Sequence, residues 1–413
     1  MAEQTCPPVD ESQVREILES RRVNIFFQPV VAIASQSIIG FEAFSRVAGD
    51  ECCLGTQMLF HKDLSSDLVV GVDRMCREKA LEKFTSIHDT HSEMLLYLNV
   101  NVDITSYIEP DVAFLSGKLE KLGINPGSIV LEGVTSSYDL DRLGRFCRVF
   151  RELGVKICLD SCSVDESFNI AISKLCPEFV KLNRSFFGEA ERRDYSAKTL
   201  ETLLSVADHV GSSVVGCGVE TEEESIRLLL AGVDLQQGYY YTKGEDRDPS
   251  DPAKLFREKM VATYDKYLKV KNRLVRHRKE WFAQAFKGVS AVCSKLSNIA
   301  EERLEDGCRC LVHKVDGIIS LFILDDKGRQ ITRRIPVGSA QPANRPDVIL
   351  KTNIGSDHSV EDYSIYLDIG YEKFVTPPFA SPFTGEQACL ISRPFFTVQG
   401  TRYVACVEMA YPG

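Results

Sequence analysis

The sequence predicts an α/β protein with three parts: a (β/α)8, TIM-like barrel over residues 12–245, a helical connector over 252–306 and a smaller α+β domain over 307–413. Three observations lead to this prediction. Apolar runs of strand length alternate with helical stretches from residue 24 to residue 242, a charged segment with two prolines follows, and strand-like alternation dominates residues 308–413. The length of 413 residues fits two or three domains.

Eight apolar runs, rich in Val, Ile, Leu and aromatic residues, supply the expected strands of the barrel. Stretches with helical spacing fall between the later runs, over residues 139–153, 197–209 and 222–231. This order indicates βα units around a mostly parallel, buried sheet. The expected strands are 25–31, 38–44, 94–99, 129–132, 155–160, 179–181, 213–217 and 235–241.

The pattern changes twice after the barrel. Apolar residues at helical spacing over residues 254–304 predict one long helix or two in tandem, with a basic outer face. Alternating segments then predict a five- or six-stranded sheet. They cover residues 310–313, 317–324, 330–335, 363–368, 388–392 and 401–407.

The composition excludes several classes of function. The chain has 49 Lys and Arg against 59 Asp and Glu, a net charge of −10, which disfavours broad binding to nucleic acid. No apolar run approaches the roughly 18 residues of a membrane span, and the start lacks the features of a secretory signal. We therefore expect a cytoplasmic protein without a transmembrane segment. None of the 14 cysteines forms a C-x-x-C pair, so we expect reduced thiols.

Polar residues gather where the expected strands end. One polar residue after a strand is usually a turn or a helix cap. Four strands in succession end on one here, with a Gln on a fifth run and a Glu inside the second, which predicts a site at the carboxyl face of the barrel. The residues are Asn99, Glu132, Asp160, Lys181, Gln237 and Glu42.

Eight short motifs stand in the order in which a known family carries them. They are Phe27–Pro29, Phe41–Arg46, Leu98–Asn101, Val130–Glu132, Cys158–Ser161, Val180–Asn183, Gly216–Thr221 and Gln237–Tyr239. Through these motifs, residues 12–244 resemble the EAL domain, the bacterial phosphodiesterase module that hydrolyses cyclic di-GMP.

The resemblance implies a metal site and a nucleotide pocket. It assigns one divalent cation, Mg²⁺, Mn²⁺ or Ca²⁺, to four oxygen ligands: Glu42, Asn99, Glu132 and Asp160. It also implies cyclic di-GMP as the ligand, bound by Gln28, Glu42, Phe44, Arg46, Asn99, Asp160, Lys181, Glu220 and Gln237. The residues alone leave open a rim salt bridge for Arg46 and buried, satisfied amides for Gln28 and Gln237.

The sequence departs from the family pattern mainly at positions that the family uses to hold a second metal ion. Hydrolysis of this type needs two divalent cations, and the resemblance gives the second one carboxylates at the positions of Ser161, Asn183 and Cys217. A Glu of the family is Thr135, and the glycine-rich loop of the family is replaced by residues 161–167, which contain no glycine. These losses predict a degenerate phosphodiesterase without catalytic residues.

The second half resembles, more weakly, the PAS-like or Cache-like sensor that follows the barrel in the YkuI type of EAL protein. Residues 368–371, 375–385 and 391–394 carry this resemblance, and an ordinary hairpin is the alternative.

The sequence thus predicts a catalytically inactive bacterial EAL protein that acts as a cyclic di-GMP receptor or signalling scaffold. The alternatives are a weak residual phosphodiesterase and an interaction module that no longer binds the nucleotide. We further expect a homodimer, an unknown protein partner, and the only tryptophan, Trp281, near a hinge between connector and sensor.

Overall fold

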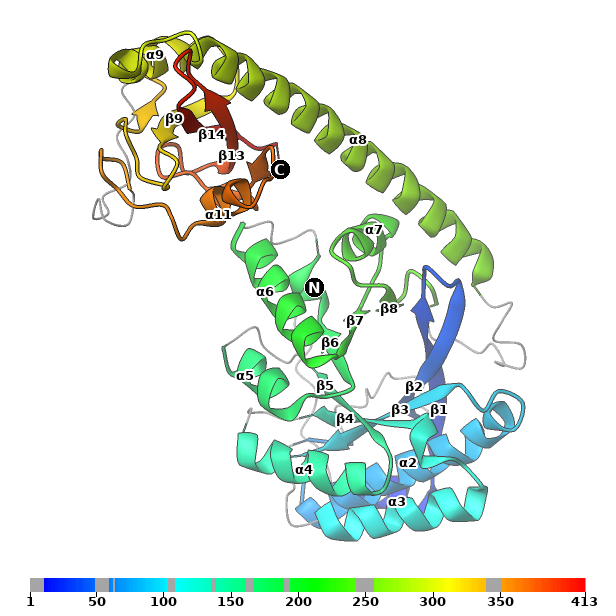
Figure 1. Cartoon of the computed structure of the whole chain (residues 1–413). Coiled ribbons are helices and arrows are strands. Elements are labelled where there is room, and N and C mark those ends of the chain that lie inside the picture. Colours follow the sequence, from blue (N-terminus) through cyan, green and yellow to red (C-terminus); the bar gives the residue numbers. More distant parts are fainter. Residues whose placement is uncertain are drawn as a thin grey trace. The chain divides into compact units, whose positions relative to one another are not determined.

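The computed structural model describes residues 11–48, 59–61, 64–102, 108–134, 139–160, 166–188, 194–242, 256–338 and 351–412. The chain divides into two compact units, Met1–Val270 and Lys271–Gly413, which are described separately (Figure 1). Thr135, Ser161 and the charged segment after the barrel lie outside the described residues. The predicted domain boundaries therefore stay predictions.

The first unit contains a closed eight-stranded barrel, so the predicted fold class is confirmed. Strands β2 to β8 run parallel, whereas β1 is antiparallel to both of its neighbours, β2 and β8. The reason is the short turn between β1 and β2, because a parallel pair would need a long crossover. The strands are β1 (Val23–Ala32), β2 (Ser37–Val47), β3 (Leu95–Asn101), β4 (Ile129–Val134), β5 (Lys156–Asp160), β6 (Phe179–Leu182), β7 (Ser213–Cys217) and β8 (Leu235–Gln237).

Helices surround the barrel strands (Figure 1). Local signals start two of them: the Asp139 side chain accepts hydrogen bonds at the start of α4, and Thr221 forms a capping box with Glu224 at the start of α7. The helices are α1 (Glu11–Ser20), α2 (Ser66–His88), α3 (Ile108–Leu122), α4 (Leu140–Glu152), α5 (Glu166–Leu175), α6 (Asp194–Val210) and α7 (Glu222–Leu230), with short 3₁₀ turns at Pro126–Ser128 and Arg184–Phe186.

Two apolar clusters fill the barrel unit. The larger one packs the outer faces of the strands against the helices. The smaller one is a separate cluster of strand residues, among them Val30, Tyr97, Val130, Cys158 and Val215. It is largely apolar, and the ammonium of Lys181 lies over the ring of Tyr97, one of its members.

The second unit is an antiparallel sheet with helices, in the strand order β10-β9-β14-β13-β11, and β12 pairs with β13. The single long helix α8 (Arg257–Leu296) runs from the first unit into this one, and the buried side chains of its second half pack into the core of the sheet unit. The other elements are α9 (Leu304–Leu311), α11 (Asp362–Asp368), β9 (Ile318–Leu324), β10 (Ile335–Pro336), β11 (Phe374–Val375), β12 (Phe379–Ala380), β13 (Gln387–Phe396) and β14 (Arg402–Ala410), with a 3₁₀ turn at Glu301–Arg303.

Two strand predictions in this unit are wrong. Residues 310–313 overlap the end of α9, and residues 363–368 lie in α11. In α9 the buried positions are Leu304, Gly307, Cys308 and Leu311, a helical spacing that the short apolar run concealed. The predicted strand 330–335 is reduced to β10 and a bridge between Leu324 and Gln330.

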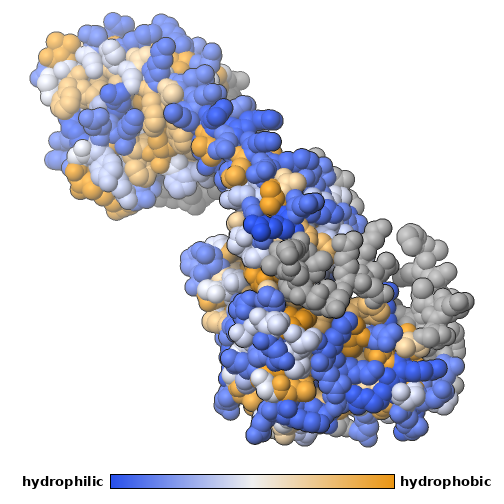
Figure 2. Space-filling model, turned by 90° about the vertical axis from the view of Figure 1, so that its right-hand side faces the viewer, coloured by the Kyte–Doolittle hydropathy of each residue, from blue (hydrophilic) through white to orange (hydrophobic). Residues whose placement is uncertain are grey.

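The described surface and helices give no sign of a membrane span. On the face shown in Figure 2, hydrophobic residues form separate patches among hydrophilic ones. Within the ranges that the structure describes, every helix is too short or too polar to cross a bilayer.

Candidate functional site

The polar strand ends meet at one mouth of the barrel. Asn99 on β3 is in register with Glu132 on β4, and Asp160 on β5 is in register with Lys181 on β6. Glu42 comes from β2, two strands away from Glu132. Carboxyl ends of parallel strands share one face of a barrel, so the sequence order alone brings these side chains together.

A buried ion cluster forms the centre of this mouth. Nζ of Lys181 lies 2.6 Å from Oε2 of Glu42 and is also ion-paired with Glu132. All three side chains are less than one-tenth exposed. The ammonium also lies 5.7 Å from the centre of the Tyr97 ring. Two buried carboxylates therefore share a single ammonium.

Amide groups hold Glu42 in place. Nδ2 of Asn99 donates to Oε1 of Glu42 at 3.0 Å, and Nε2 of Gln237 donates to Oε2 at 2.7 Å. The same Gln237 amide donates to Oε1 of Gln28 at 2.9 Å. Gln28 and Gln237 are therefore hydrogen-bonded amides, and Gln237 also orders the carboxylate at the centre of the site.

The cluster holds more negative than positive charge. Burial, followed by the Glu42 charge, raises the pKa of Glu132 to about 8, with Lys181 opposing and Asp160 adding to the shift. Burial disfavours the charge on Lys181, but Glu132 and Glu42 together raise its pKa well above its ordinary value. Fully ionised, three carboxylates and one ammonium would leave a formal charge of −2. This imbalance favours a further cation or a proton.

The residues at the expected second-metal positions are not anionic. Burial raises the pKa of the Cys217 thiol well above its ordinary value, and the charge of Lys181 does not offset this. Its Sγ lies 3.7 Å from Oε1 of Gln237. Oδ1 of Asn183 accepts a hydrogen bond from the amide of Ser185 and caps a short 3₁₀ turn. Neither side chain offers a charged oxygen.

The four predicted metal ligands have suitable chemistry, but the structure does not arrange them as a metal site. Among the residues that the structure describes, no three His, Cys, Asp or Glu side chains are arranged to hold a metal ion. The ammonium of Lys181 instead contacts two of the predicted ligands, Glu42 and Glu132. The chemistry of the donors still fits a hard cation, since they are carboxylates and an amide with excess negative charge.

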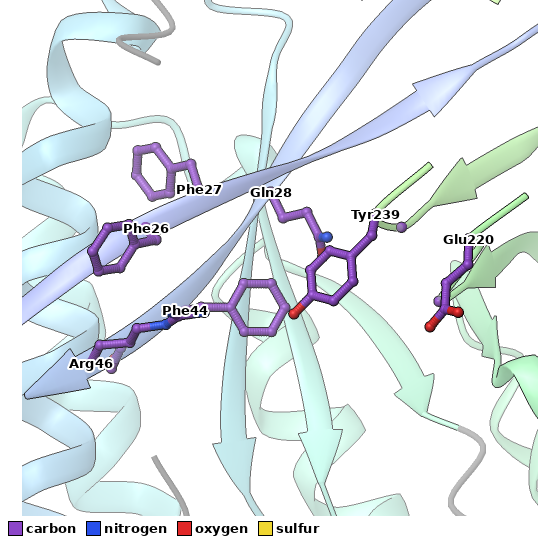
Figure 3. Close-up of a pocket in the computed structure, with 10 residues that line it drawn as sticks. Phe26, Phe27, Gln28, Phe44, Arg46, Glu220 and Tyr239 are labelled. Atoms are coloured by element: carbon purple, nitrogen blue, oxygen red, sulfur yellow. The ribbon is translucent and has the colours of Figure 1, made fainter. Parts of the chain in front are cut away.

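A pocket of about 370 Å³ opens beside this cluster. Four predicted binding residues line it: Gln28, Phe44, Arg46 and Glu220 (Figure 3). Arg46 forms no ion pair with a carboxylate of the described residues, and its guanidinium lies 5.5 Å from the centre of the Phe26 ring. The rim salt bridge considered for Arg46 is thus not present among those residues.

Glu220 lines the pocket and also forms an ion pair. Its Oε2 lies 2.5 Å from Nη1 of Arg184, which also pairs with the buried Glu224. Glu220 therefore stands at the pocket with its charge already matched by an arginine.

The sequence reasoning missed three aromatic residues of this pocket, Phe26, Phe27 and Tyr239. Phe26 lies two positions before Gln28 on β1, so the two-residue period of a strand could have found it. Tyr239 follows β8 and is 56% exposed. Its ring lies next to that of Phe44 in the view of Figure 3. Together with Phe44 it gives the pocket flat apolar surfaces.

Comparisons with known proteins agree with this architecture. The family model described as the EAL domain matches residues 11–244. The uncharacterised protein Rv1357c of Mycobacterium tuberculosis is 24% identical over 243 residues, which cover 56% of this chain and 78% of that protein. The cyclic di-GMP phosphodiesterase NbdA of Pseudomonas aeruginosa is 21% identical, covering 56% of this chain and 30% of that protein.

A solved structure extends the likeness to both units. The Bacillus subtilis YkuI protein, in complex with cyclic di-GMP and calcium, superposes with a TM-score of 0.79. The match covers 98% of this chain and 100% of that chain at 16% sequence identity. At this identity the likeness shows a shared fold for the barrel and the sheet unit.

Proposed function

The chain belongs to the EAL domain family, and on that premise we propose that its barrel is a cyclic di-GMP receptor that does not hydrolyse the nucleotide. NbdA is named as a cyclic di-GMP phosphodiesterase and YkuI was solved with the nucleotide bound. The proposal that this chain is a receptor rather than an enzyme rests on its own residues.

One observation carries the binding half of the proposal. Arg46 is exposed, has no ion-pair partner among the described residues and lines a pocket with Phe44 and Tyr239. A guanidinium can bind a phosphate through two parallel hydrogen bonds, and aromatic rings can stack on a base. We assign Arg46 to a phosphate and the two rings to a guanine.

The loss of hydrolysis follows from the charges. A two-metal reaction needs carboxylates that hold both cations. Cys217 is a protonated thiol and Asn183 a neutral amide engaged in a cap. A second cation would have no anionic oxygen from either residue. The phosphodiester would then lack a second stabilising charge on its oxygens.

A single divalent cation is part of the proposal. Glu42, Asn99, Glu132 and Asp160 would hold it, and it would supply positive charge for the phosphate oxygens. The role of the chain is then to keep Glu42 oriented through Asn99 and Gln237, whose amides already bind that carboxylate. The domain boundaries, a PAS-like or Cache-like second unit, an unknown protein partner and a homodimer remain proposals beside it.

The test is isothermal titration of the full chain with cyclic di-GMP, with and without Ca²⁺. We expect binding, and Arg46→Ala should weaken it by about 1.5–3 kcal/mol, the worth of a charge-assisted hydrogen bond. Arg15→Ala, an exposed arginine on α1 away from the pocket, is the matched control and should bind like the wild type.

Two results would overturn the proposal. Without binding at high micromolar nucleotide in a folded sample, the barrel would be an interaction module. Equal weakening of binding by Arg46→Ala and Arg15→Ala would show that Arg46 does not bind the nucleotide specifically.

A further inference from the structure

A second pocket, of about 460 Å³, lies wholly within the unit Lys271–Gly413. Five parts of the chain meet around it: α8, the start of α11, β11 with the residues that follow it, β13 and the residues that follow β14. Its volume is within the roughly 300–1,000 Å³ of small-molecule sites. The pocket is far along the sequence from every residue of the barrel site.

The walls of this pocket are mostly aromatic and apolar. Phe282 from α8, Phe374 from β11 and Tyr411 near the end of the chain line it. Cys389 from β13 also lines it and is only 1% exposed, and burial raises the pKa of its thiol to about 11, so that it is uncharged. Such walls suit a flat apolar group.

Two opposite charges line the same pocket and have no ion-pair partner among the described residues. Arg278 on α8 and Asp362 at the first turn of α11 both line it. Neither forms an ion pair or side-chain hydrogen bond with another described residue, nor with the other. The positive charge of Arg278 acts on the Cys389 thiol, where it opposes the effect of burial, so the guanidinium lies near that wall.

These features define the chemistry of a ligand. An unpaired guanidinium favours a carboxylate, an unpaired carboxylate favours an ammonium group, and the rings favour an aromatic body. We propose that this pocket binds a small zwitterion with an aromatic side group, that is, a molecule of the amino-acid class, through Arg278 and Asp362. This proposal does not depend on cyclic di-GMP binding by the barrel.

The chain contains a built-in reporter for this pocket. Trp281, the only tryptophan, precedes Phe282, and its ring lies 4.9 Å from that of Phe282 and 5.0 Å from that of Tyr411. Its Nε1 donates to the carbonyl of Ala410 at 2.9 Å. A ligand against Phe282 and Tyr411 changes the surroundings of this indole, so its emission reports occupancy.

The test is a titration of the full chain with L-phenylalanine, followed through Trp281 emission with excitation at a wavelength that phenylalanine does not absorb. Two analogues test the two charged groups of phenylalanine separately. The analogue 3-phenylpropanoate lacks the ammonium group, and 2-phenylethylamine lacks the carboxylate. We expect saturable binding of phenylalanine, at least tenfold tighter than that of either analogue.

Variants of the two charged residues sharpen the test. Arg278→Gln should weaken phenylalanine at least tenfold but leave 2-phenylethylamine unchanged, whereas Asp362→Asn should weaken phenylalanine and spare 3-phenylpropanoate. Arg276→Gln, an exposed arginine of the same helix that does not line the pocket, is the control and should bind normally. Melting curves check that each variant is folded.

Two outcomes contradict the proposal. One is the absence of any saturable response to all three compounds at 10 mM. The other is equal weakening by Arg278→Gln and Arg276→Gln.

Discussion

A buried charge cluster of the sheet unit balances its charges, whereas the buried cluster at the mouth of the barrel does not. In the sheet unit, Arg334 pairs with the fully buried Glu408 at 2.9 Å, Ser320 donates to the same carboxylate, and the guanidinium lies over the rings of Phe322 and Phe383. At the barrel mouth, Lys181 pairs with both Glu42 and Glu132, with Asp160 near. We expect the balanced pair to serve the fold, and we propose that the excess negative charge of the barrel cluster serves a ligand.

The largest expected effect comes from removing the cation of each of these two clusters. Lys181→Met and Arg334→Met should each lower the free energy of unfolding by about 3–5 kcal/mol, because buried carboxylates lose their counter-ion. The two variants should differ in whether Ca²⁺ restores their stability. Millimolar Ca²⁺ should raise the melting temperature of Lys181→Met more than that of the wild type, since a cation can replace the ammonium.

Arg334→Met is the matched control in that experiment, because Glu408 is a single carboxylate in a packed sheet. Its melting temperature should not respond to Ca²⁺. An equal response of both variants would erase the distinction between the two clusters.

The next effect concerns a buried imidazole of the sheet unit. Burial, with the Lys351 charge, lowers the pKa of His358 to about 4, and its ring nitrogens pair with Tyr363 and Gln330. The unfolded chain takes up a proton below pH 6.5 that the folded one does not. The contribution of His358 to the free energy of unfolding is therefore fully present above about pH 6.5. It falls by about 3 kcal/mol as the pH drops towards 4.

Denaturant unfolding of the sheet unit between pH 7 and pH 4 measures this slope. In His358→Gln most of the slope should disappear, whereas in His313→Gln, where the histidine is exposed, it should persist. An unchanged slope in His358→Gln would assign the acid sensitivity to other groups.

The smallest effect is expected where charges are exposed. Arg309 and Glu305 pair at 2.8 Å on α9, with side chains 53% and 30% exposed. Arg309→Gln should change the free energy of unfolding by less than about 0.5 kcal/mol, because solvent screens such pairs. A loss near that of Arg334→Met would show that burial is not what separates strong from weak pairs here.

The sequence predicted the barrel well because its strands are short apolar runs bounded by polar residues. All eight strands were located, yet the antiparallel direction of β1 was not, since it depends on a turn rather than on apolar pattern. The run at 363–368 was mistaken for a strand because a short apolar segment fits both periods.

The sequence named residues that meet at the barrel mouth, but it did not predict which of them contact each other. Glu42 and Lys181 were both named, but their contact joins strands β2 and β6 across the barrel and no local pattern encodes it. Tyr239 was missed as a pocket residue for the same reason. The pocket around Arg278 and Asp362 is made by five separate segments and gave no signal in the sequence.

Receptor and enzyme are separated most directly by product analysis. Purified full chain is incubated with cyclic di-GMP and Mg²⁺ or Mn²⁺, and linear pGpG is quantified beside Glu42→Ala, which removes the carboxylate at the centre of the cluster. We predict that both proteins release no more pGpG than buffer, while the wild type binds the nucleotide. Multiple turnovers by the wild type that Glu42→Ala abolishes would contradict a receptor without hydrolysis.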